Sequence, residues 1–396
     1  MHKKKLLLLG GGYAEIPLIQ AAKKLGYYVI SSGNNIKGLG HKFADETKLE
    51  DYNDKKAILL LSKKLKINFI CAGCNDFAAL TASYVAEKLK LPGHDSFKYS
   101  KLIHHKDSLR EFLKKNKIPS PNAKGFNKKS SALLNLKNFK YPIIIKPVDL
   151  TGGKGITRVN NLDEAKKAIN KAFKKSLVKR IIIEKFINGS HHGISTFISN
   201  GKVIFYLYDD EYYYHNPYLV SAASSPGTIK KKIIKLLIEI IEKISLKLQL
   251  KIGIVHVQFI ITSSNKLKII EICRRAPGDL YVLLVKYATG QNYPEFIIRS
   301  SSGMDCSSLK MPKKQKYLVR YCIMSKNYGV VEKIKIHNSI QDNIINKIIW
   351  CKPKMLITNP MQQKLGIIFF KFNSKKEMKI KTAIMDRLIE VIVIKK

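Results

Sequence analysis

Short apolar runs alternate with longer amphipathic stretches over the first hundred residues of the chain. The apolar runs lie at 5–10, 27–33 and 67–73, and each is short enough to be a single buried strand. The stretches between them space their apolar residues at the interval of a helix that covers a sheet. Strands and helices that alternate in this way form parallel sheets joined by right-handed crossovers. We therefore predict a doubly wound α/β unit over 1–100.

The middle of the chain, 101–303, mixes longer strands with helices. The segment YPIIIKPVDLTGGKGITRV predicts an apolar strand, a glycine loop and a second strand. A hairpin that turns at Asn200-Gly201 is expected in 194–208, because this dipeptide tolerates the left-handed backbone of a tight turn. The other elements expected here are helices at 106–116, 162–175 and 230–250, and strands at 255–262 and 266–273.

Beyond Gly303 the pattern changes to short strands and turns, with LVRYCIM, GVVEKIKI and LGIIFFKF as strand candidates. This change indicates a small C-terminal β-rich domain. The chain is then an α/β and α+β protein of three domains, at 1–100, 101–303 and 304–396. A length of 396 residues and a hydrophobic content of 45% are sufficient for that many cores.

The chain is strongly basic, with 72 Lys and Arg against 29 Asp and Glu and a formal net charge of +43. Such a charge raises the question of nucleic-acid binding. Only 8 of the basic residues are arginine, however, and the lysines are spread from one end to the other. Proteins that read nucleic acid favour arginine and gather their basic residues on one element. We therefore infer a solvated lysine surface and no nucleic-acid partner.

The sequence predicts neither a membrane helix nor a disulfide framework. No uninterrupted apolar stretch approaches about 18 residues, and the most apolar helix candidate, 233–250, carries five charged side chains. Six cysteines in a chain of this length fit reduced thiols. Cys71 and Cys74 form a lone CxxC without the second ligand pair of a zinc site. We expect a cytoplasmic protein that does not contact a membrane.

Two glycine turns follow strands of the predicted parallel sheet. Gly10-Gly11-Gly12 follow the first strand, but the run GGGYAE lacks the full GxGxxG spacing of dinucleotide-binding loops. A tight turn without a cofactor is therefore favoured over a dinucleotide site. Asp76 opens a helix after Gly73 and either contacts a substrate or caps that helix, and capping is favoured.

A lysine and a glycine loop stand together in the middle of the chain. Lys146 ends an apolar strand, and Gly152-Gly153-Lys154-Gly155 follow after a short connection. Successive N–H groups of a glycine loop can hold phosphate oxygens, and lysines supply compensating positive charge. The spacing is not that of a Walker A loop. Taken alone, such a loop is a hairpin turn at least as often as a phosphate site.

Three further features favour phosphate chemistry. Lys106 stands at the start of a predicted helix. The segment IIIEKFINGS at 181–190 offers an acidic residue, a lysine and an apolar connector whose backbone could contact adenine. Glu271 ends a strand, and Arg274 and Arg275 follow it. A carboxylate that binds Mg²⁺ beside guanidinium groups is the electrostatic arrangement that phosphoryl transfer requires.

In this order the motifs resemble those of the ATP-grasp superfamily, and the resemblance covers nearly all of the chain. YPIIIKPVDLTGGKGITRV is similar to the lysine strand and glycine loop of biotin carboxylases, IIIEKFI to the adenine hinge, and VHVQFI with IIEICRRAPGD to the metal-binding strand pair. Residues 1–100 resemble the pre-grasp domain, and 317–394 resemble the small C-terminal domain of carboxylases and amino-acid ligases. The resemblance implies an ATP-grasp domain of two subdomains at 101–303.

The resemblance also implies a role for each matching residue. Glu271 would bind Mg²⁺, or Mn²⁺ in its place. Arg275 would face the transferred phosphate with Arg274 nearby as a substrate contact, and Lys146 completes this catalytic set. Solvated charge is the alternative for Lys106, Lys185 and Arg274 in so basic a chain. The implied phosphate contacts are Lys106, Lys146, Gly152, Gly153, Lys154 and Gly155, and the implied adenine contacts are Glu184, Lys185, Phe186 and Ile187.

Three positions depart from the family pattern. The second metal-binding carboxylate is here Gln258, a neutral amide and a weaker ligand for Mg²⁺. An acidic ribose contact is expected shortly after Glu184, where this chain has His191 and His192. These histidines either hydrogen-bond ribose or belong to a surface loop. The asparagine usual after the metal-binding glutamate is Cys273.

The reaction implied by the resemblance is that of an ADP-forming ligase, which activates a carboxylate as an acyl phosphate and joins it to an amine or similar nucleophile. ATP and Mg²⁺ are the implied cofactors, small carboxylates and amines the implied partners, and a homodimer the implied assembly. The run RRAPGDLY is more similar to amino-acid ligases than to biotin carboxylase. The alternative is a nucleotide-binding protein that has lost catalysis. Candidate substrate contacts are Asp209, Asp210 and 212–215, although an aromatic run also suits strand packing.

Overall fold

The computed structural model describes residues 3–313 and 315–394. Its N-terminal part is a parallel sheet in the order β3-β2-β1-β4. Leu6 and Leu8 of β1 pack on the side of α1, and Leu7 and Leu9 pack on the side of α2 and α3, because alternate side chains of a strand point to opposite faces. The predicted doubly wound unit is confirmed. Its elements are β1 (Lys5–Leu9), α1 (Ile16–Lys24), β2 (Tyr28–Ser32), β3 (Glu46–Thr47), α2 (Lys55–Leu65), β4 (Phe69–Ala72), α3 (Asp76–Leu89) and α4 (Phe97–His104).

The glycine turn after β1 is filled by the protein's own side chains. A Cβ at Gly11 would lie 2.0 Å from the ring of His41, and one at Gly10 would lie 2.7 Å from Glu15. Glu15 also accepts a hydrogen bond from the Gly12 N–H, at 2.9 Å. The interpretation of this run as a tight turn is confirmed, since its glycines are required by packing within the chain.

One eight-stranded antiparallel sheet contains strands from both the middle and the end of the chain. Its order is β13-β12-β9-β10-β11-β14-β18-β16. The strand β14 pairs directly with β11, so the sheet continues across the change of pattern at Gly303, where a domain boundary is predicted. The strands are β9 (Ser190–Ser199), β10 (Lys202–Tyr212), β11 (Ala222–Ser225), β12 (Gly253–Ile261), β13 (Leu267–Cys273), β14 (Tyr317–Met324), β16 (Ile344–Ile349) and β18 (Lys364–Phe372).

Helices cover both faces of this large sheet. The helix α8 (Lys231–Lys247) places a row of isoleucines and Leu237 against Val255 and Val257 of β12. On the other face, α9 (Tyr281–Thr289) and α10 (Tyr293–Ser301) share a core with β1 and α1, so the N-terminal unit and the large sheet are packed as one body. The predicted hairpin turns at Asn200-Gly201, whose φ angles are 50° and 75°.

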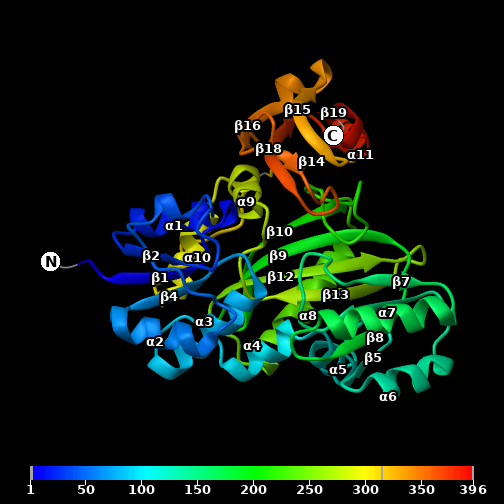
Figure 1. Cartoon of the computed structure of the whole chain (residues 1–396). Helices are drawn as coiled ribbons and strands as arrows, with labels where there is room; N and C mark the ends of the chain where they lie inside the picture. Colours follow the sequence, from blue (N-terminus) through cyan, green and yellow to red (C-terminus); the bar gives the residue numbers. More distant parts are fainter. Residues whose placement is uncertain (1–2, 314, 395–396) are drawn as a thin grey trace.

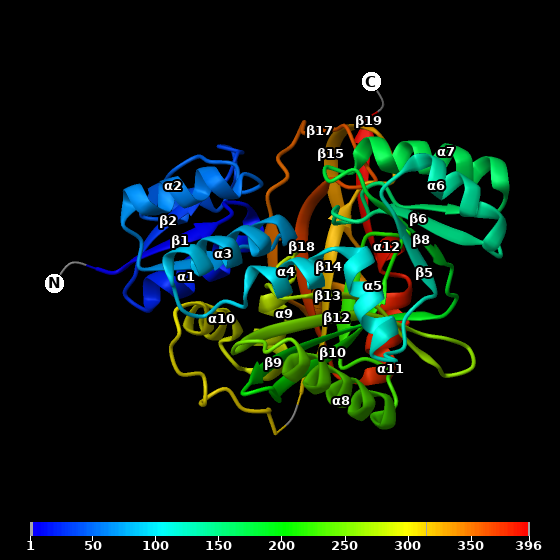
Figure 2. The same ribbon diagram turned by 90° about the horizontal axis from the view of Figure 1, so that it is seen from below.

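A smaller four-stranded sheet in the order β5-β8-β6-β7 stands at one end of the large sheet, on the side away from the N-terminal unit (Figure 1). Figure 2 shows α6 and α7 on its outer side. The site described below lies where this sheet meets α5 and β13. The elements are α5 (Lys106–Lys115), β5 (Ala123–Phe126), α6 (Lys129–Leu134), β6 (Ile143–Pro147), β7 (Thr157–Val159), α7 (Leu162–Lys175) and β8 (Ile181–Lys185).

The C-terminal segment adds a three-stranded sheet in the order β17-β15-β19, which packs against β14 and β18. The predicted strands LVRYCIM, GVVEKIKI and LGIIFFKF correspond to β14, β15 and β18. Among residues 3–313 and 315–394, no helix is long and apolar enough to cross a membrane. The remaining elements are β15 (Gly329–Ile336), β17 (Leu356–Ile357), α11 (Lys375–Ala383), α12 (Met385–Leu388) and β19 (Ile389–Ile394).

Candidate active site

A buried cluster of ion pairs stands at the end of β6. The Nζ of Lys146 lies 2.6 Å from Oε2 of Glu184, and the Nε of Arg110 lies 2.9 Å from the other oxygen of that carboxylate. Lys146 and Glu184 meet because β6 and β8 pair in a register that places them diagonally on one face. Burial lowers the pKa of the Lys146 ammonium. Burial favours the neutral form of Glu184, but Arg110 and Lys146 hold its pKa below the usual range.

Lys106 joins this cluster to β13. Its Nζ lies 2.9 Å from Oε1 of Glu271 and donates a 2.8 Å hydrogen bond to the carbonyl of Leu150, in the connection that follows β6. Burial favours the neutral amine, but Glu271 and Asp76 outweigh it and raise the pKa of Lys106. The buried ammonium groups of Lys106 and Lys146 are close enough for their charges to interact. Two neighbouring positive charges suit a ligand with several negative charges.

The glycine loop connects the antiparallel strands β6 and β7. Gly152, Gly153 and Gly155 have φ angles of 63°, 73° and 76°, a left-handed conformation that glycine adopts without strain. Lys154 is exposed. The loop is thus a hairpin connection by topology, and it follows directly after the Leu150 carbonyl that Lys106 contacts. Its predicted role as a phosphate cover stays a prediction.

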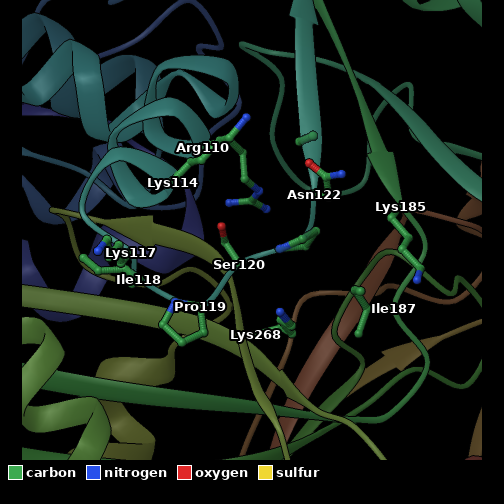
Figure 3. Close-up of a pocket in the computed structure, with 12 residues that line it drawn as sticks. Arg110, Lys114, Lys117, Ile118, Pro119, Ser120, Asn122, Lys185, Ile187 and Lys268 are labelled. Carbon is green, nitrogen blue, oxygen red and sulfur yellow. The ribbon is translucent and has the colours of Figure 1, made fainter. Parts of the chain in front are cut away.

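The predicted adenine hinge leaves β8 next to a cavity. The N–H of Lys185 donates to the Asn122 carbonyl at 2.9 Å, and Arg158 stacks over the Phe186 ring at 4.2 Å from its centre. A cavity of about 600 Å³ opens beside the hinge, with Lys185 and Ile187 at its wall. Figure 3 shows the side chains around it. The lining residues are Arg110, Lys114, Lys117, Ile118, Pro119, Ser120, Pro121, Asn122, Ala123, Lys185, Ile187 and Lys268.

The predicted metal pair is aligned across two strands. Gln258 of β12 is the direct partner of Glu271 of β13. A carboxylate oxygen and an amide oxygen are both ligands that Mg²⁺ accepts. In this structure Glu271 forms an ion pair with the Lys106 ammonium. Cys273 is buried and paired with His256, so it faces the interior. Within the described part of the chain no three His, Cys, Asp or Glu side chains gather as a metal site.

The two predicted arginines are held by the N-terminal unit. The Nε of Arg275 donates to Asp76 at 2.6 Å, and Asp76 also lies 3.2 Å from Nδ1 of His104. Burial favours the neutral form of Asp76, but Arg275 and His104 hold its pKa far below the usual range. The preferred capping role for Asp76 was wrong, because Asn75 caps α3 by accepting the Phe77 N–H.

Arg274 is turned away from this cluster. Its guanidinium donates to both oxygens of Asp95, at 2.7 and 3.1 Å, and to the carbonyls of Ile254 and Lys251. Arg274 and Arg275 lie in a bend directly after β13 ends at Cys273, and their guanidinium groups pair with different carboxylates. The structure therefore brings Arg275, and not Arg274, toward Lys106 and Glu271. Arg274 ties the N-terminal unit to β12.

Comparisons with known proteins identify the fold. A family model described as the phosphoribosylglycinamide synthetase ATP-grasp (A) domain matches residues 104–215, which contain Lys106, Lys146, the glycine loop and Glu184. The matched part of the chain, residues 104–215, is therefore similar to an ATP-grasp domain. The resemblance and the fold class predicted from the sequence are confirmed.

Several solved ATP-grasp structures match the whole chain at low sequence identity. The L-amino acid ligase of Bacillus licheniformis has a TM-score of 0.81 at 18% identity and covers 100% of both chains. Phosphoribosylglycinamide synthetase of Anaerococcus prevotii has a TM-score of 0.77 at 22% identity, covering 99% of this chain and 100% of that one. The biotin carboxylase domain of the Hydrogenobacter thermophilus 2-oxoglutarate carboxylase has a TM-score of 0.78 at 18% identity and covers 99% and 91%. At these identities the likeness establishes the ATP-grasp fold.

A curated relative is the carbamoyl phosphate synthase large chain of Clostridium botulinum, 23% identical over 290 residues. The match includes 69% of this chain and 27% of the relative. The chain thus spans about a quarter of the length of the curated relatives that it matches.

The two candidate ribose histidines are adjacent on β9 and point to opposite faces of the large sheet. His192 is buried and its Nδ1 lies 2.8 Å from Asp210, on the face of β9 and β10 opposite to the cluster. His191 lies on the other face, where its ring packs 4.9 Å from that of Tyr213. Of the two, only His191 shares a face with the candidate site.

The run at 209–215 is also divided between faces. Asp209 is fully buried and accepts a hydrogen bond from Tyr281, and burial together with the neighbouring Glu211 raises its pKa. Tyr213 donates to Glu211 at 2.7 Å. Tyr212 and Tyr214 stack on each other beside the C-terminal core, as the strand-packing alternative predicts.

Sequence reasoning missed two charged side chains: Arg110 of the buried cluster, and Glu211, which accepts a hydrogen bond from Gln258. Arg110 stands four residues after Lys106 and therefore on the same face of α5. Glu211 stands two residues after Asp209 and therefore on the same face of β10. The helical or strand spacing could have placed each residue beside a predicted site residue. Neither residue belongs to a recognised motif, so neither was considered.

His105, which precedes Lys106, should make stability depend on pH. Its Nδ1 lies 2.7 Å from Arg180, and burial with the Arg180 charge lowers the pKa of His105 to about 4. An unfolded histidine titrates near pH 6.5, so between these values the unfolded chain binds a proton that the folded chain does not. The free energy of unfolding should therefore fall as pH drops from 6.5 to 4, by up to about 1.4 kcal/mol per pH unit from this group. Urea unfolding at pH 7, 6, 5 and 4 should show a smaller slope for His105→Gln, and an unchanged slope would contradict this assignment.

Proposed function

We propose that the protein is an ADP-forming ligase that activates a small carboxylate and joins it to an amine. The observation that carries this proposal is a group of buried ion pairs: Lys146 pairs with Glu184, and Lys106 pairs with Glu271. Arg275 lies near enough to Glu271 for their charges to interact. These cations can neutralise the charge that spreads over phosphoryl oxygens during transfer. The fold of the solved relatives, which include an L-amino acid ligase, supports the same reaction class.

The proposed reaction has two steps. A carboxylate oxygen of the substrate attacks the γ-phosphorus of ATP, the bond to the β-phosphate oxygen breaks, and ADP leaves. The amine then attacks the acyl carbon of the acyl phosphate, inorganic phosphate leaves, and the nitrogen loses a proton. A bound Mg²⁺ supplies charge neutralisation on the phosphates. Glu271 and Gln258 would hold it, because they present a carboxylate and an amide oxygen side by side.

The residues of the chain have distinct parts in this proposal. Lys146 and Lys106 bind phosphate oxygens, and the hinge at Lys185 and Ile187 holds adenine at the adjoining cavity. Arg275 is held in place by Asp76 and faces the transferred phosphoryl group. The glycine loop excludes water from the acyl phosphate, which water would otherwise hydrolyse.

The test is ADP formation from Mg-ATP with pooled small carboxylates and amines, separated by chromatography. We expect ADP and phosphate that depend on the pool and are absent for Lys146→Met. AMP as the product would contradict the mechanism. Nucleotide binding without any product would favour a second candidate, an ATP-binding protein without catalysis, for which the neutral Gln258 and the buried Cys273 are the supporting observations.

A further inference from the structure

Glu211 reaches the metal strand pair from two strands away. Its Oε1 accepts a 2.7 Å hydrogen bond from Nε2 of Gln258, and its Oε2 accepts one of 2.7 Å from the Tyr213 hydroxyl. The strand between them, β9, places Gly193 directly beside Gln258. A Cβ at Gly193 would lie 2.9 Å from the Asp209 carboxylate, so the face of β9 between Gln258 and β10 is closely packed.

The contact between Glu211 and Gln258 decides the orientation of the Gln258 amide. A carboxylate oxygen is an acceptor, so the NH₂ group of the amide must face it, since two facing oxygens would repel. The amide oxygen is consequently directed away from Glu211. Gln258 is half-buried, and in residues 3–313 and 315–394 no hydrogen bond engages its Oε1. Its backbone partner on the opposite side of β12 is Glu271.

We propose that Glu211 is a positioning residue of the cation site, which fixes the Gln258 amide with its oxygen available as a ligand and adds the negative charge that this neutral amide lacks. The inference rests on the proposed function, because it assumes that Gln258 and Glu271 hold a divalent cation. A single carboxylate at Glu271 shares its charge with Lys106, at 2.9 Å. Lys106 therefore competes with the cation for the charge of Glu271. The Glu211 carboxylate, which is hydrogen-bonded to Gln258, adds negative charge near the site and offsets this competition.

Tyr213 supports the same geometry. Its hydroxyl occupies the second oxygen of Glu211, so the carboxylate has a donor on each side and one defined orientation. Residues that orient metal ligands in this way affect metal affinity without contacting the metal. Glu211 therefore acts through Gln258, and its contribution should be visible in cation binding itself.

The experiment titrates Mn²⁺ into the full chain in the presence of ADP and follows free Mn²⁺ by electron paramagnetic resonance. Glu211→Gln removes the charge and allows either orientation of the Gln258 amide, so Mn²⁺ affinity should fall about tenfold. The double variant Glu211→Gln/Gln258→Glu returns a carboxylate to the pair and should recover affinity to within about threefold of the unaltered protein. Tyr213→Phe should lower affinity by less than Glu211→Gln does.

The matched control is Glu242→Gln on α8, which removes a carboxylate paired with the exposed Lys202 of β10. We expect no change in Mn²⁺ affinity for it, and circular dichroism should show that every variant is folded. Unaltered affinity in Glu211→Gln would overturn the inference, as would a double variant no better than Glu211→Gln. Calorimetric titration with ADP in the absence of metal distinguishes failure of this inference from failure of the proposed function. If the unaltered protein binds no ADP, the proposed function is contradicted. If it binds ADP and Glu211→Gln binds Mn²⁺ as tightly as the unaltered protein does, only the role of Glu211 is contradicted.

Discussion

Replacing Lys146 with methionine should weaken the binding of ADP by about 100-fold, equivalent to about 2.7 kcal/mol. Lys146 carries one of the two buried ammonium groups of the cluster. A hydrogen bond between an ammonium and a phosphate oxygen is strong in such a site, because water does not compete for either partner. Methionine keeps most of the volume of the side chain and removes only its charge and donors.

The fold should survive this substitution. Glu184 retains Arg110, whose Nε lies 2.9 Å from its other oxygen, so the buried carboxylate is not left without a cation. Calorimetric titration with ADP measures the loss, and Lys137→Met, at an exposed position before β6, is the matched control. Affinity within a few-fold of the unaltered protein would contradict the assignment of Lys146 to the phosphates.

Replacing Arg274 with methionine should destabilise the protein by about 3–5 kcal/mol. Arg274 makes two hydrogen bonds to Asp95 and further ones to the carbonyls of Ile254 and Lys251. Asp95 is buried, and burial raises its pKa while Arg274 outweighs that effect and lowers it. Without Arg274 the carboxylate stays in a site that disfavours its charge, and the connection between the N-terminal unit and β12 is lost.

The single tryptophan gives a local readout of this loss. Trp350 stacks on Tyr13 at 4.1 Å, which joins the C-terminal segment to the N-terminal unit. Urea unfolding followed by its fluorescence and by circular dichroism should show a lower midpoint for Arg274→Met. Arg299→Met removes a half-exposed pair with Glu295 and should cost no more than about 1 kcal/mol. Equal effects of the two substitutions would refute the structural role of Arg274.

Local pattern was sufficient for much of the fold. The helix at 162–175 and the turn at Asn200-Gly201 occur where the sequence predicts them, because helical spacing of apolar residues and the left-handed tolerance of Asn-Gly are local properties. The change of pattern at Gly303 was also visible. The pattern of residues could not indicate that β14 pairs with β11 in the same sheet, because the pairing of strands that are distant in the chain depends on tertiary contacts.

By itself the sequence determined the order of the motifs, and with it the resemblance to the ATP-grasp superfamily and the lysine near the end of β6. The direct pairing of Gln258 with Glu271 came from the register of β12 and β13 in the structure. Only the tertiary structure decided which charged side chains meet. Arg275 and Arg274 are adjacent in the chain, yet one contacts Asp76 and the other Asp95, because the chain bends directly after β13 and the two side chains meet different segments of the N-terminal unit. Glu211 reaches Gln258 because three strands lie side by side, and nothing in the order of residues along the chain specifies that neighbourhood.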